Sequence, residues 1–439
     1  MSDIGVSTAW KMLIQPERIN YSMENLGPKL TCFQSRDCYR KDFTFKNSRQ
    51  NEICVSLFFP IPPNSDHTNL ESLTLNVPCV VYCHSQSGNR IEGSFLQEWC
   101  IENNYGLCLF DFNGCGKSGG EYVTLGWKEH DDLEVLINIL TKEYRATQIA
   151  LWGRSMGAVT SIMYAKRHSL YLSAMILDSP FSDISVMVKD VAYEHLKIPG
   201  LIVSMALRLM SSTVKDKVHF DILKLKPAEF AKTCTVPCVF IIGKEDKLVL
   251  PKRVQEIFDA YVGKQKVIIT SEGGHSDERE PHILNQCFKL LFQEIQKNSY
   301  VPRATLQTTP EYVDTIPDDY LATLTNEFSN RLTSNIRSSN QKNGINKPYN
   351  INNGKPFNFD YNIEDERKDS MPLIQDSNHF ASNTSKHNYK PRYNDYTMDN
   401  TLDKSEQQIN PLKDYGDISA MDLEKNIKDI SMVMRNQRL

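Results

Sequence analysis

The sequence of 439 residues lacks several features that mark secreted or membrane-spanning proteins. Its N-terminal stretch has no apolar core between a basic start and a small-residue cleavage site, so no signal peptide is predicted. Ser2 stands where myristoylation would need Gly. The most apolar central run, Leu201 to Met210, contains Arg208 and is too short to cross a bilayer. These absences predict a cytoplasmic protein with no transmembrane segment.

The sequence also lacks the patterns of metal, nucleotide and nucleic-acid binding. No two CxxC pairs occur, and the eleven Cys residues are scattered through apolar runs, which is typical of reduced, buried thiols. Gly116-Lys117-Ser118 resembles the end of a phosphate-binding loop, but Asp111 stands where that motif needs Gly. The net charge of −4 is too small to indicate a nucleic-acid partner. We therefore expect no metal, no cofactor and no nucleic acid.

The composition changes near residue 300. All four Trp and all eleven Cys precede that position, and short apolar runs alternate there with amphipathic runs. The stretch 301–439 is rich in Asn, Ser, Lys and Asp and has few large aliphatic residues. Such a composition buries too little apolar surface to offset the entropy of the chain. We predict one folded domain over 1–300 and a mostly disordered tail over 301–439.

The end of the tail differs from the rest of it. Apolar residues recur there at spacings of three and four, which predicts an amphipathic helix over 419–435. This helix either docks on the domain, docks on a protein partner, or remains a marginal helix in solvent. The residues that carry the pattern are Ala420, Leu423, Ile427, Ile430 and Met434.

Short apolar runs bounded by turn residues predict the strands of the domain. Helical patterns separate most of them, and the clearest of these covers Trp127–Tyr144. Continuous apolar strands alternating with helices predict an α/β fold, in which a mostly parallel sheet is covered by helices on both faces. The predicted strands are a hairpin of Asp42–Lys46 with Ile53–Phe59, followed by Pro78–Cys83, Leu107–Phe112, Gln148–Trp152, Ala174–Leu177, Val236–Ile242 and Lys266–Thr270.

One strand runs directly into a motif of nucleophilic catalysis. Gly153-Arg154-Ser155-Met156-Gly157 follows the strand ending at Trp152 and precedes a helical pattern, which is G-x-S-x-G in a strand–turn–helix context. The sharp turn needs small neighbours and lifts the Ser hydroxyl to its tip, beside the N–H groups of the following helix. Ser155 is therefore the predicted nucleophile.

A serine nucleophile needs a base, and the base needs a carboxylate to orient it. In this architecture the acid and then the His follow later strands. Asp246 follows the strand Val236–Ile242, and His275 follows the strand Lys266–Thr270, so these two residues are the predicted acid and base. Glu245 and Asp178 remain alternatives for the acid.

The oxyanion of an acyl-transfer intermediate needs two N–H donors. Met156, which follows the nucleophile, is one predicted donor. The other is expected from the loop after Pro78–Cys83, where Gln86 is preferred and Ser85 is the alternative. The alternative interpretation is that His84 and its neighbours only shape a turn.

On these motifs the chain resembles the α/β-hydrolase superfamily, and more narrowly its cytosolic serine aminopeptidase-like or Bem46-like branch. The resemblance spans about residues 25–298 and implies the α/β-hydrolase fold with a small helical cap. Members often have His-Gly where this chain has His84-Ser85, so the Ser side chain is expected to narrow the oxyanion loop. The segments that carry the resemblance are His84–Arg90, Asp111–Gly119, Gly153–Gly157, Asp178–Phe181, Gly243–Asp246 and Gly274-His275.

The expected cap covers about 181–232 and has two helix-like runs. Its apolar side chains either form a pocket for an acyl or alkyl group or pack the cap onto the sheet. The candidates for this pocket are Met187, Val191, Leu201, Met205 and Leu209.

The resemblance names a reaction class rather than a substrate, because the superfamily includes esterases, thioesterases that deacylate proteins, and lipid hydrolases. The expected function is hydrolysis of a carboxylic ester or thioester in a small molecule or an acylated protein. A serine peptidase is one alternative. The other is a non-enzymatic protein that keeps the hydrolase fold and binds a protein partner through its tail.

Overall fold

The computed structural model describes residues 9–62, 67–169, 172–299 and 420–436. The predicted disordered tail lies outside the described residues, except for the helix near its end. Within the described ranges a nine-stranded sheet runs in the order β1-β2-β3-β5-β4-β6-β7-β8-β9. The strands are β1 (Leu30–Cys32), β2 (Asp37–Lys46), β3 (Glu52–Pro60), β4 (Cys79–Cys83), β5 (Gly106–Phe110), β6 (Ile149–Arg154), β7 (Leu172–Asp178), β8 (Cys238–Gly243) and β9 (Lys266–Ser271).

The sheet has an antiparallel edge and a parallel body. Strands β1, β2 and β3 pair antiparallel, and β3 joins β5 in the same sense. From β5 through β4 to β9, every neighbouring pair is parallel. The carboxyl ends of the parallel strands therefore meet at one edge, where sites form in sheets of this kind. The predicted hairpin and the six predicted strands that follow it are all present.

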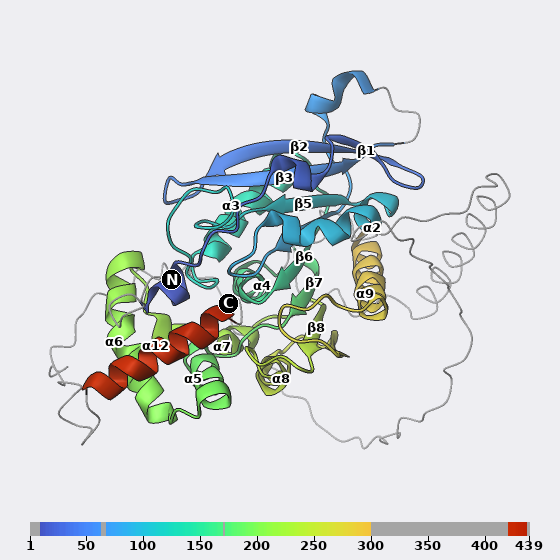
Figure 1. The fold of residues 1–439 in the computed structure, drawn as a ribbon. Helices are drawn as coiled ribbons and strands as arrows, with labels where there is room; N and C mark the ends of the chain where they lie inside the picture. Colours follow the sequence, from blue (N-terminus) through green and yellow to red (C-terminus); the bar gives the residue numbers. More distant parts are fainter. Residues whose placement is uncertain (1–8, 63–66, 170–171, 300–419, 437–439) are drawn as a thin grey trace, which may run out of the picture. The chain divides into compact units, whose positions relative to one another are not determined.

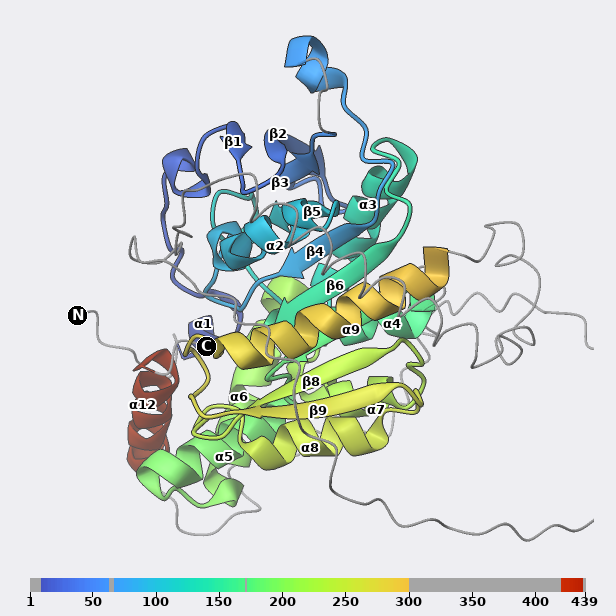
Figure 2. The same ribbon diagram turned by 90° about the vertical axis from the view of Figure 1, so that its right-hand side faces the viewer.

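Helices cover both faces of the sheet, as the parallel strands require (Figures 1 and 2). Helices α2 and α9 lie on one face, and α3, α4, α7 and α8 lie on the other. The helices are α1 (Lys11–Ile14), α2 (Gln97–Glu102), α3 (Glu129–Lys142), α4 (Met156–His168), α5 (Ile184–Leu196), α6 (Gly200–Val218), α7 (Pro227–Ala231), α8 (Pro251–Ala260), α9 (Pro281–Ser299) and α12 (Ala420–Asn436). Short 3₁₀ turns are η2 (Met23–Leu26), η3 (His67–Ser72), η4 (Arg90–Leu96) and η6 (Ile222–Lys224).

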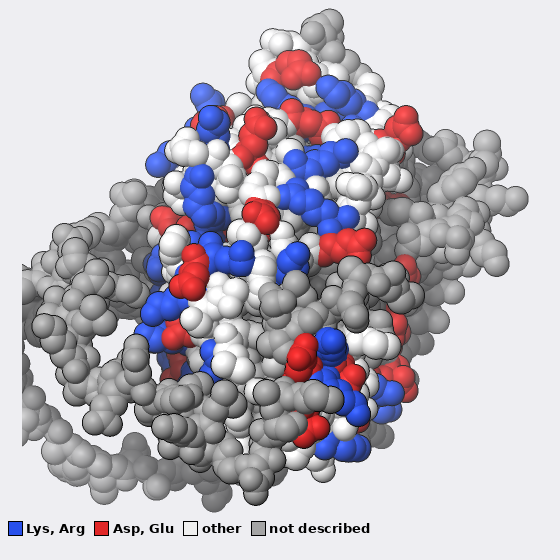
Figure 3. Space-filling view, turned by 60° about the vertical axis from the view of Figure 1, so that its left-hand side comes forward, with Lys and Arg blue, Asp and Glu red and all other residues white. Residues whose placement is uncertain are grey.

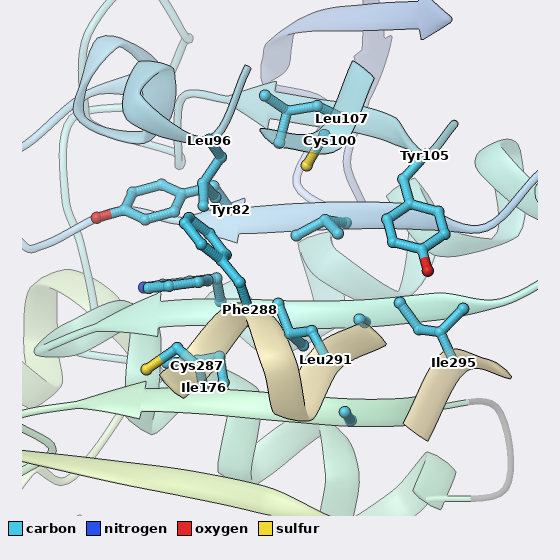
Figure 4. Packing of buried hydrophobic residues seen from close by; sticks show 14 of the residues in the cluster. Tyr82, Leu96, Cys100, Tyr105, Leu107, Ile176, Cys287, Phe288, Leu291 and Ile295 are labelled. Atoms are coloured by element: carbon cyan, nitrogen blue, oxygen red, sulfur yellow. The ribbon is translucent and has the colours of Figure 1, made fainter. Parts of the chain in front are cut away.

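The apolar residues of the strands and of α9 form the main core on one face of the sheet. Figure 4 shows Cys287, Phe288, Leu291 and Ile295 of α9 with their side chains among those of the sheet and α2. Strands β4, β5 and β8 are buried along their whole length, which explains why they read as continuous apolar runs. The rigid edge that this packing creates carries the candidate site.

The predicted cap and the predicted terminal helix lie together. Helices α5 and α6 form the cap, and α12 belongs to the same compact unit and packs against both of them (Figure 1).

On the face in Figure 3, Lys and Arg side chains are interspersed with Asp and Glu. Among the described helices, none combines the length and the apolarity needed to span a bilayer. All eleven Cys residues are free thiols, and nine of them are buried.

Candidate functional site

Ser155 lies on the sharp turn between β6 and α4. It has φ 52° and ψ −115°, a backbone conformation that residues with a side chain rarely adopt. Its N–H donates to the carbonyl of Asp178 at the end of β7 (2.8 Å), and its carbonyl accepts from the N–H of Val159 in α4 (3.0 Å). These bonds hold the strained turn between strand and helix, as a nucleophile elbow requires.

The two glycines of the motif are needed for close backbone approach. A Cβ at position 157 would lie 1.9 Å from the carbonyl oxygen of Cys83 in β4. A Cβ at position 153 would lie 2.4 Å from the carbonyl oxygen of Gly157. Both clashes are with backbone atoms, which cannot turn aside as a flexible side chain can. Gly153 and Gly157 therefore let the helix start directly against the strands.

The structure brings Ser155, His275 and Asp246 into one hydrogen-bonded row. The Oγ of Ser155 lies 3.0 Å from Nε2 of His275, and Nδ1 of that imidazole lies 2.7 Å from Oδ2 of Asp246. Because the carboxylate can only accept, Nδ1 donates to it, and Nε2 is left to accept from the hydroxyl. This tautomer is the one that a general base facing a serine needs.

The Asp246 carboxylate is itself oriented by backbone groups. Its Oδ1 accepts from the N–H of Leu248 (2.9 Å) and of Val249 (2.7 Å) while Oδ2 faces the imidazole. Asp246 is 2% exposed, whereas the neighbouring Glu245 is exposed. Of the three carboxylates considered from the sequence, Asp246 is the one whose oxygen lies against His275.

Asp178, the other alternative, is paired elsewhere. Its carboxylate accepts from Nε and Nη2 of Arg279, with a shortest distance of 2.8 Å, and lies 3.8 Å from Nε of Arg154. Burial alone would raise the pKa of Asp178, but the two guanidinium groups outweigh burial and hold that pKa below its usual value. Asp178 is therefore an ionised anchor at the end of β7.

The same two arginines hold the loop that carries the histidine. Nη2 of Arg154 donates to the carbonyls of His275 (2.6 Å) and Asp277 (2.7 Å). Nη1 of Arg279 donates to the carbonyl of Gly274 (2.8 Å). The sequence analysis missed this clamp. An Arg four residues after the His and an Arg inside G-x-S-x-G were visible, but nothing in the sequence pairs them with one carboxylate.

The loop after β4 is fixed by two side chains. Nε2 of His84 accepts from the N–H of Phe112 (2.9 Å), so Nδ1 carries the proton and donates to the carbonyl of Ser85 (2.6 Å). Glu92 binds both the N–H and the hydroxyl of Ser85, the latter at 2.7 Å. The Ser85 side chain, expected to narrow the loop, is thus held by Glu92.

The two predicted oxyanion donors lie on these rigid parts. Met156 is the first residue of α4, so its N–H has no acceptor within the helix. Gln86 lies on the loop after β4 and is 1% exposed. Its side-chain Nε2 donates to the carbonyls of Met12 (3.1 Å) and Leu13 (2.8 Å) in α1, a contact that the sequence analysis did not anticipate. The only indication of this contact in the sequence was the apolar run around α1.

The cap differs from the expectation at two positions. Leu201 and Leu209 were candidates for the acyl or alkyl pocket or for packing the cap onto the sheet, and they are 53% and 38% exposed. Both lie on the outward face of α6, because the helix turns its other face to α5 and α12. Met187, Val191 and Met205 are buried as expected. In the described part of the chain, no three His, Cys, Asp or Glu side chains are grouped as metal ligands would be.

Comparison with known families agrees with this geometry. Residues 80–223 match the family described as serine aminopeptidase, S33. Over this segment the chain is similar to the α/β-hydrolase superfamily. The matched segment contains Ser155 and ends before Asp246 and His275, so the relation of those two residues to Ser155 rests on the structure.

The curated relatives of this chain are distant. YqkD of Bacillus subtilis is 22% identical over 199 residues, which cover 45% of this chain and 64% of that protein. YfhR of Escherichia coli K12 is 22% identical over 204 residues, which cover 46% of this chain and 64% of that protein. Both are uncharacterized. The chain thus spans less than two thirds of the length of either relative.

Two solved structures similar to this chain are esterases. One is an esterase of Pyrococcus furiosus, with 20% identity, a TM-score of 0.46, and coverage of 65% of this chain and 98% of that chain. The other is the acetyl xylan esterase of Paenibacillus sp. R4, with 16% identity, a TM-score of 0.45, and coverage of 66% and 99%.

Proposed function

We propose that the chain is a serine hydrolase that cleaves a carboxylic ester or thioester through an acyl-enzyme on Ser155. The observation that carries the proposal is the row of Asp246, His275 and Ser155, with 2.7 Å and 3.0 Å between successive polar atoms. Each of the three residues is less than a tenth exposed, so water competes little for these bonds.

The acylation half begins when Oγ of Ser155 attacks the carbonyl carbon of the substrate. The hydroxyl proton passes to Nε2 of His275, and the carbonyl oxygen becomes an oxyanion held by the N–H groups of Met156 and Gln86. His275 then gives the proton to the departing alcohol or thiol as its bond to the carbonyl carbon breaks. Asp246 keeps the imidazole in the required tautomer and stabilises its charged form.

The deacylation half repeats these steps with water. His275 takes a proton from a water molecule, whose oxygen attacks the acyl carbon. The bond between the acyl group and Ser155 then breaks, and His275 returns the proton to Oγ. The carboxylic acid leaves, and the enzyme regains its starting state.

A substrate panel with the full chain tests the proposal. We expect hydrolysis of p-nitrophenyl butyrate and of a butyryl thioester, and a loss of at least about 10³-fold in Ser155→Ala. Ser204→Ala is the matched control, since Ser204 lies on the cap helix α6 and its hydroxyl donates to the carbonyl of Gly200. It should retain full activity. Unchanged hydrolysis in Ser155→Ala would contradict the proposal.

The same panel separates esterase from peptidase chemistry. An aminopeptidase substrate such as leucine p-nitroanilide carries a free amino group that an aminopeptidase must bind. If the chain cleaves this anilide in preference to the esters and does so through Ser155, the residue roles stand and the substrate class proposed here is wrong. We expect the esters and thioester to be preferred.

A further inference from the structure

The cap has an apolar groove, and α12 lies in it. Helices α1, α5 and α6 form the walls of the groove, and α12 packs against all three (Figures 1 and 2). The cavity left between the four helices is about 10 Å³, roughly room for one water molecule. Its wall includes Met12 and Leu13 of α1, Val188 of α5, Met210 of α6, and Ile430 and Met434 of α12.

The face of α12 in this groove is apolar apart from Ser431. Leu423, Ile427, Ile430 and Met434 are each 5% exposed or less, whereas Met432, on another face of the helix, is 64% exposed. The ion pair of Lys428 with Glu424 lies within the helix. The contact between α12 and the cap is thus stabilised by burial of apolar side chains. A flexible hydrocarbon chain would bury apolar surface in the same way.

The groove adjoins the candidate site through α1. Met12 and Leu13 line the groove with their side chains, and their carbonyls accept from the Gln86 amide of the oxyanion loop. Ser155 is 2% exposed and His275 is 6% exposed, so little of the proposed catalytic row faces solvent. Helix α12 is outside the sheet and its crossovers, so it can leave without breaking a strand pairing.

The groove can change its occupant with little cost. Met12 and Met210 of the walls and Met434 of α12 line the same cavity. Unbranched Met side chains adapt to irregular partners, which is why they recur on surfaces that bind several apolar ligands. Because α12 is covalently joined to the domain, its docking is intramolecular and independent of protein concentration.

We propose that α12 is a built-in competitor of the substrate, which fills the apolar groove of the cap and must be displaced before a long acyl chain binds there. This inference rests on the proposed ester or thioester hydrolysis. It extends that proposal to substrates whose acyl chain is long enough to occupy the groove. Short acyl groups do not reach the groove and do not compete with α12.

Matched variants of the full chain test the competition. Ile430→Asp puts a charge on the docking face and should raise kcat/KM for p-nitrophenyl laurate about tenfold, because undocked molecules become more frequent. The same variant should change kcat/KM for p-nitrophenyl acetate less than about twofold. Met432→Asp, two residues away on the exposed face, should leave both values as in the unsubstituted chain. An unchanged ratio of laurate to acetate in Ile430→Asp would overturn the inference.

A binding experiment without turnover keeps the two proposals distinguishable. Laurate, below its critical micelle concentration, is added to full-length Ser155→Ala, and hydrogen exchange of the α12 amides is measured. We expect laurate to speed exchange across α12 and acetate to leave it unchanged. Failure of laurate to bind, or binding with unchanged α12 exchange, overturns the competitor role even if ester hydrolysis is established. Conversely, faster exchange with no esterase activity would refute only the proposed reaction.

Discussion

Arg279 forms a buried ion pair with Asp178, with 2.8 Å between Nη2 and Oδ1, while its Nη1 donates to the carbonyl of Gly274 beside His275. One side chain thus joins the end of β7, where the Ser155 N–H is also anchored, to the loop that carries the proposed base. The relation between hydroxyl and imidazole depends on this pair, although neither Asp178 nor Arg279 lies in the row of proposed catalytic atoms.

Removing the Arg279 side chain should therefore affect both the free energy of unfolding and the rate of hydrolysis. Arg279→Met leaves the Asp178 carboxylate buried with only Arg154 nearby, which should lower the free energy of unfolding by about 3–5 kcal/mol. The double variant Asp178→Asn/Arg279→Met should lose less, because no buried carboxylate is left without the Arg279 guanidinium. Urea denaturation measures the free energy of unfolding of both variants. Lys244→Met, which removes an exposed ion pair with Glu272, is the control and should match the unsubstituted chain.

The acid is tested by a pair of adjacent substitutions. Asp246→Asn replaces the oxygen that accepts from the imidazole and should lower kcat by about 10³–10⁴-fold, since an amide also stabilises the wrong tautomer. Glu245→Gln changes the exposed neighbour and should leave kcat unaltered. Steady-state ester hydrolysis distinguishes them. A larger loss in Glu245→Gln than in Asp246→Asn would show that the acid is misassigned.

The close backbone approach at the turn before α4 predicts that alanine has very different effects on stability at two glycines. Gly157→Ala forces a Cβ against the Cys83 carbonyl at 1.9 Å, so we expect a loss of at least about 3 kcal/mol or no folded protein. At Gly200, the first residue of α6, the nearest atom to an added Cβ is Cδ of Lys189 at 3.8 Å. Gly200→Ala should be neutral or slightly stabilising in thermal unfolding. Equal midpoints for the two variants would contradict this packing.

Asp132, a carboxylate that lies outside the candidate site, predicts how the stability of the fold depends on pH. Burial raises the pKa of Asp132 to about 7, although the guanidinium of Arg49 at 2.5 Å opposes this effect. Between about pH 4 and pH 7 the folded chain keeps a proton that the unfolded chain has released, so this group makes stability fall as pH rises. Asp132→Asn should flatten the urea midpoint across that window. An identical slope in both proteins would mean that the carboxylate ionises normally.

The fold could be predicted from the sequence because its strands and helices are marked by patterns of neighbouring residues. Continuous apolar strands such as β4 and β8 could belong only to a sheet covered on both faces. The order of Ser155, Asp246 and His275, each after its own strand, places all three at one sheet edge by topology alone. Their proximity in the structure follows from that order.

The remaining features depend on contacts between distant residues that no local pattern encodes. The bonds of Gln86 to α1 join segments more than seventy residues apart. The exposure of Leu201 and Leu209 could not be read from the sequence, because the helical pattern of α6 does not say which apolar face meets α5 and α12. The choice between Asp246 and Asp178 needed the position of Arg279. Cytoplasmic location and the partner of the tail stay predictions.

Labelling of the full chain with a fluorophosphonate, followed by mass spectrometry of the tryptic peptide that begins at Ser155, tests the central claim most directly. Such a probe bonds covalently only to a serine oxygen that a neighbouring base has activated. We expect one phosphonyl group per chain, on Oγ of Ser155, and none in His275→Ala. A label on another residue, or an unlabelled folded chain, would contradict the account.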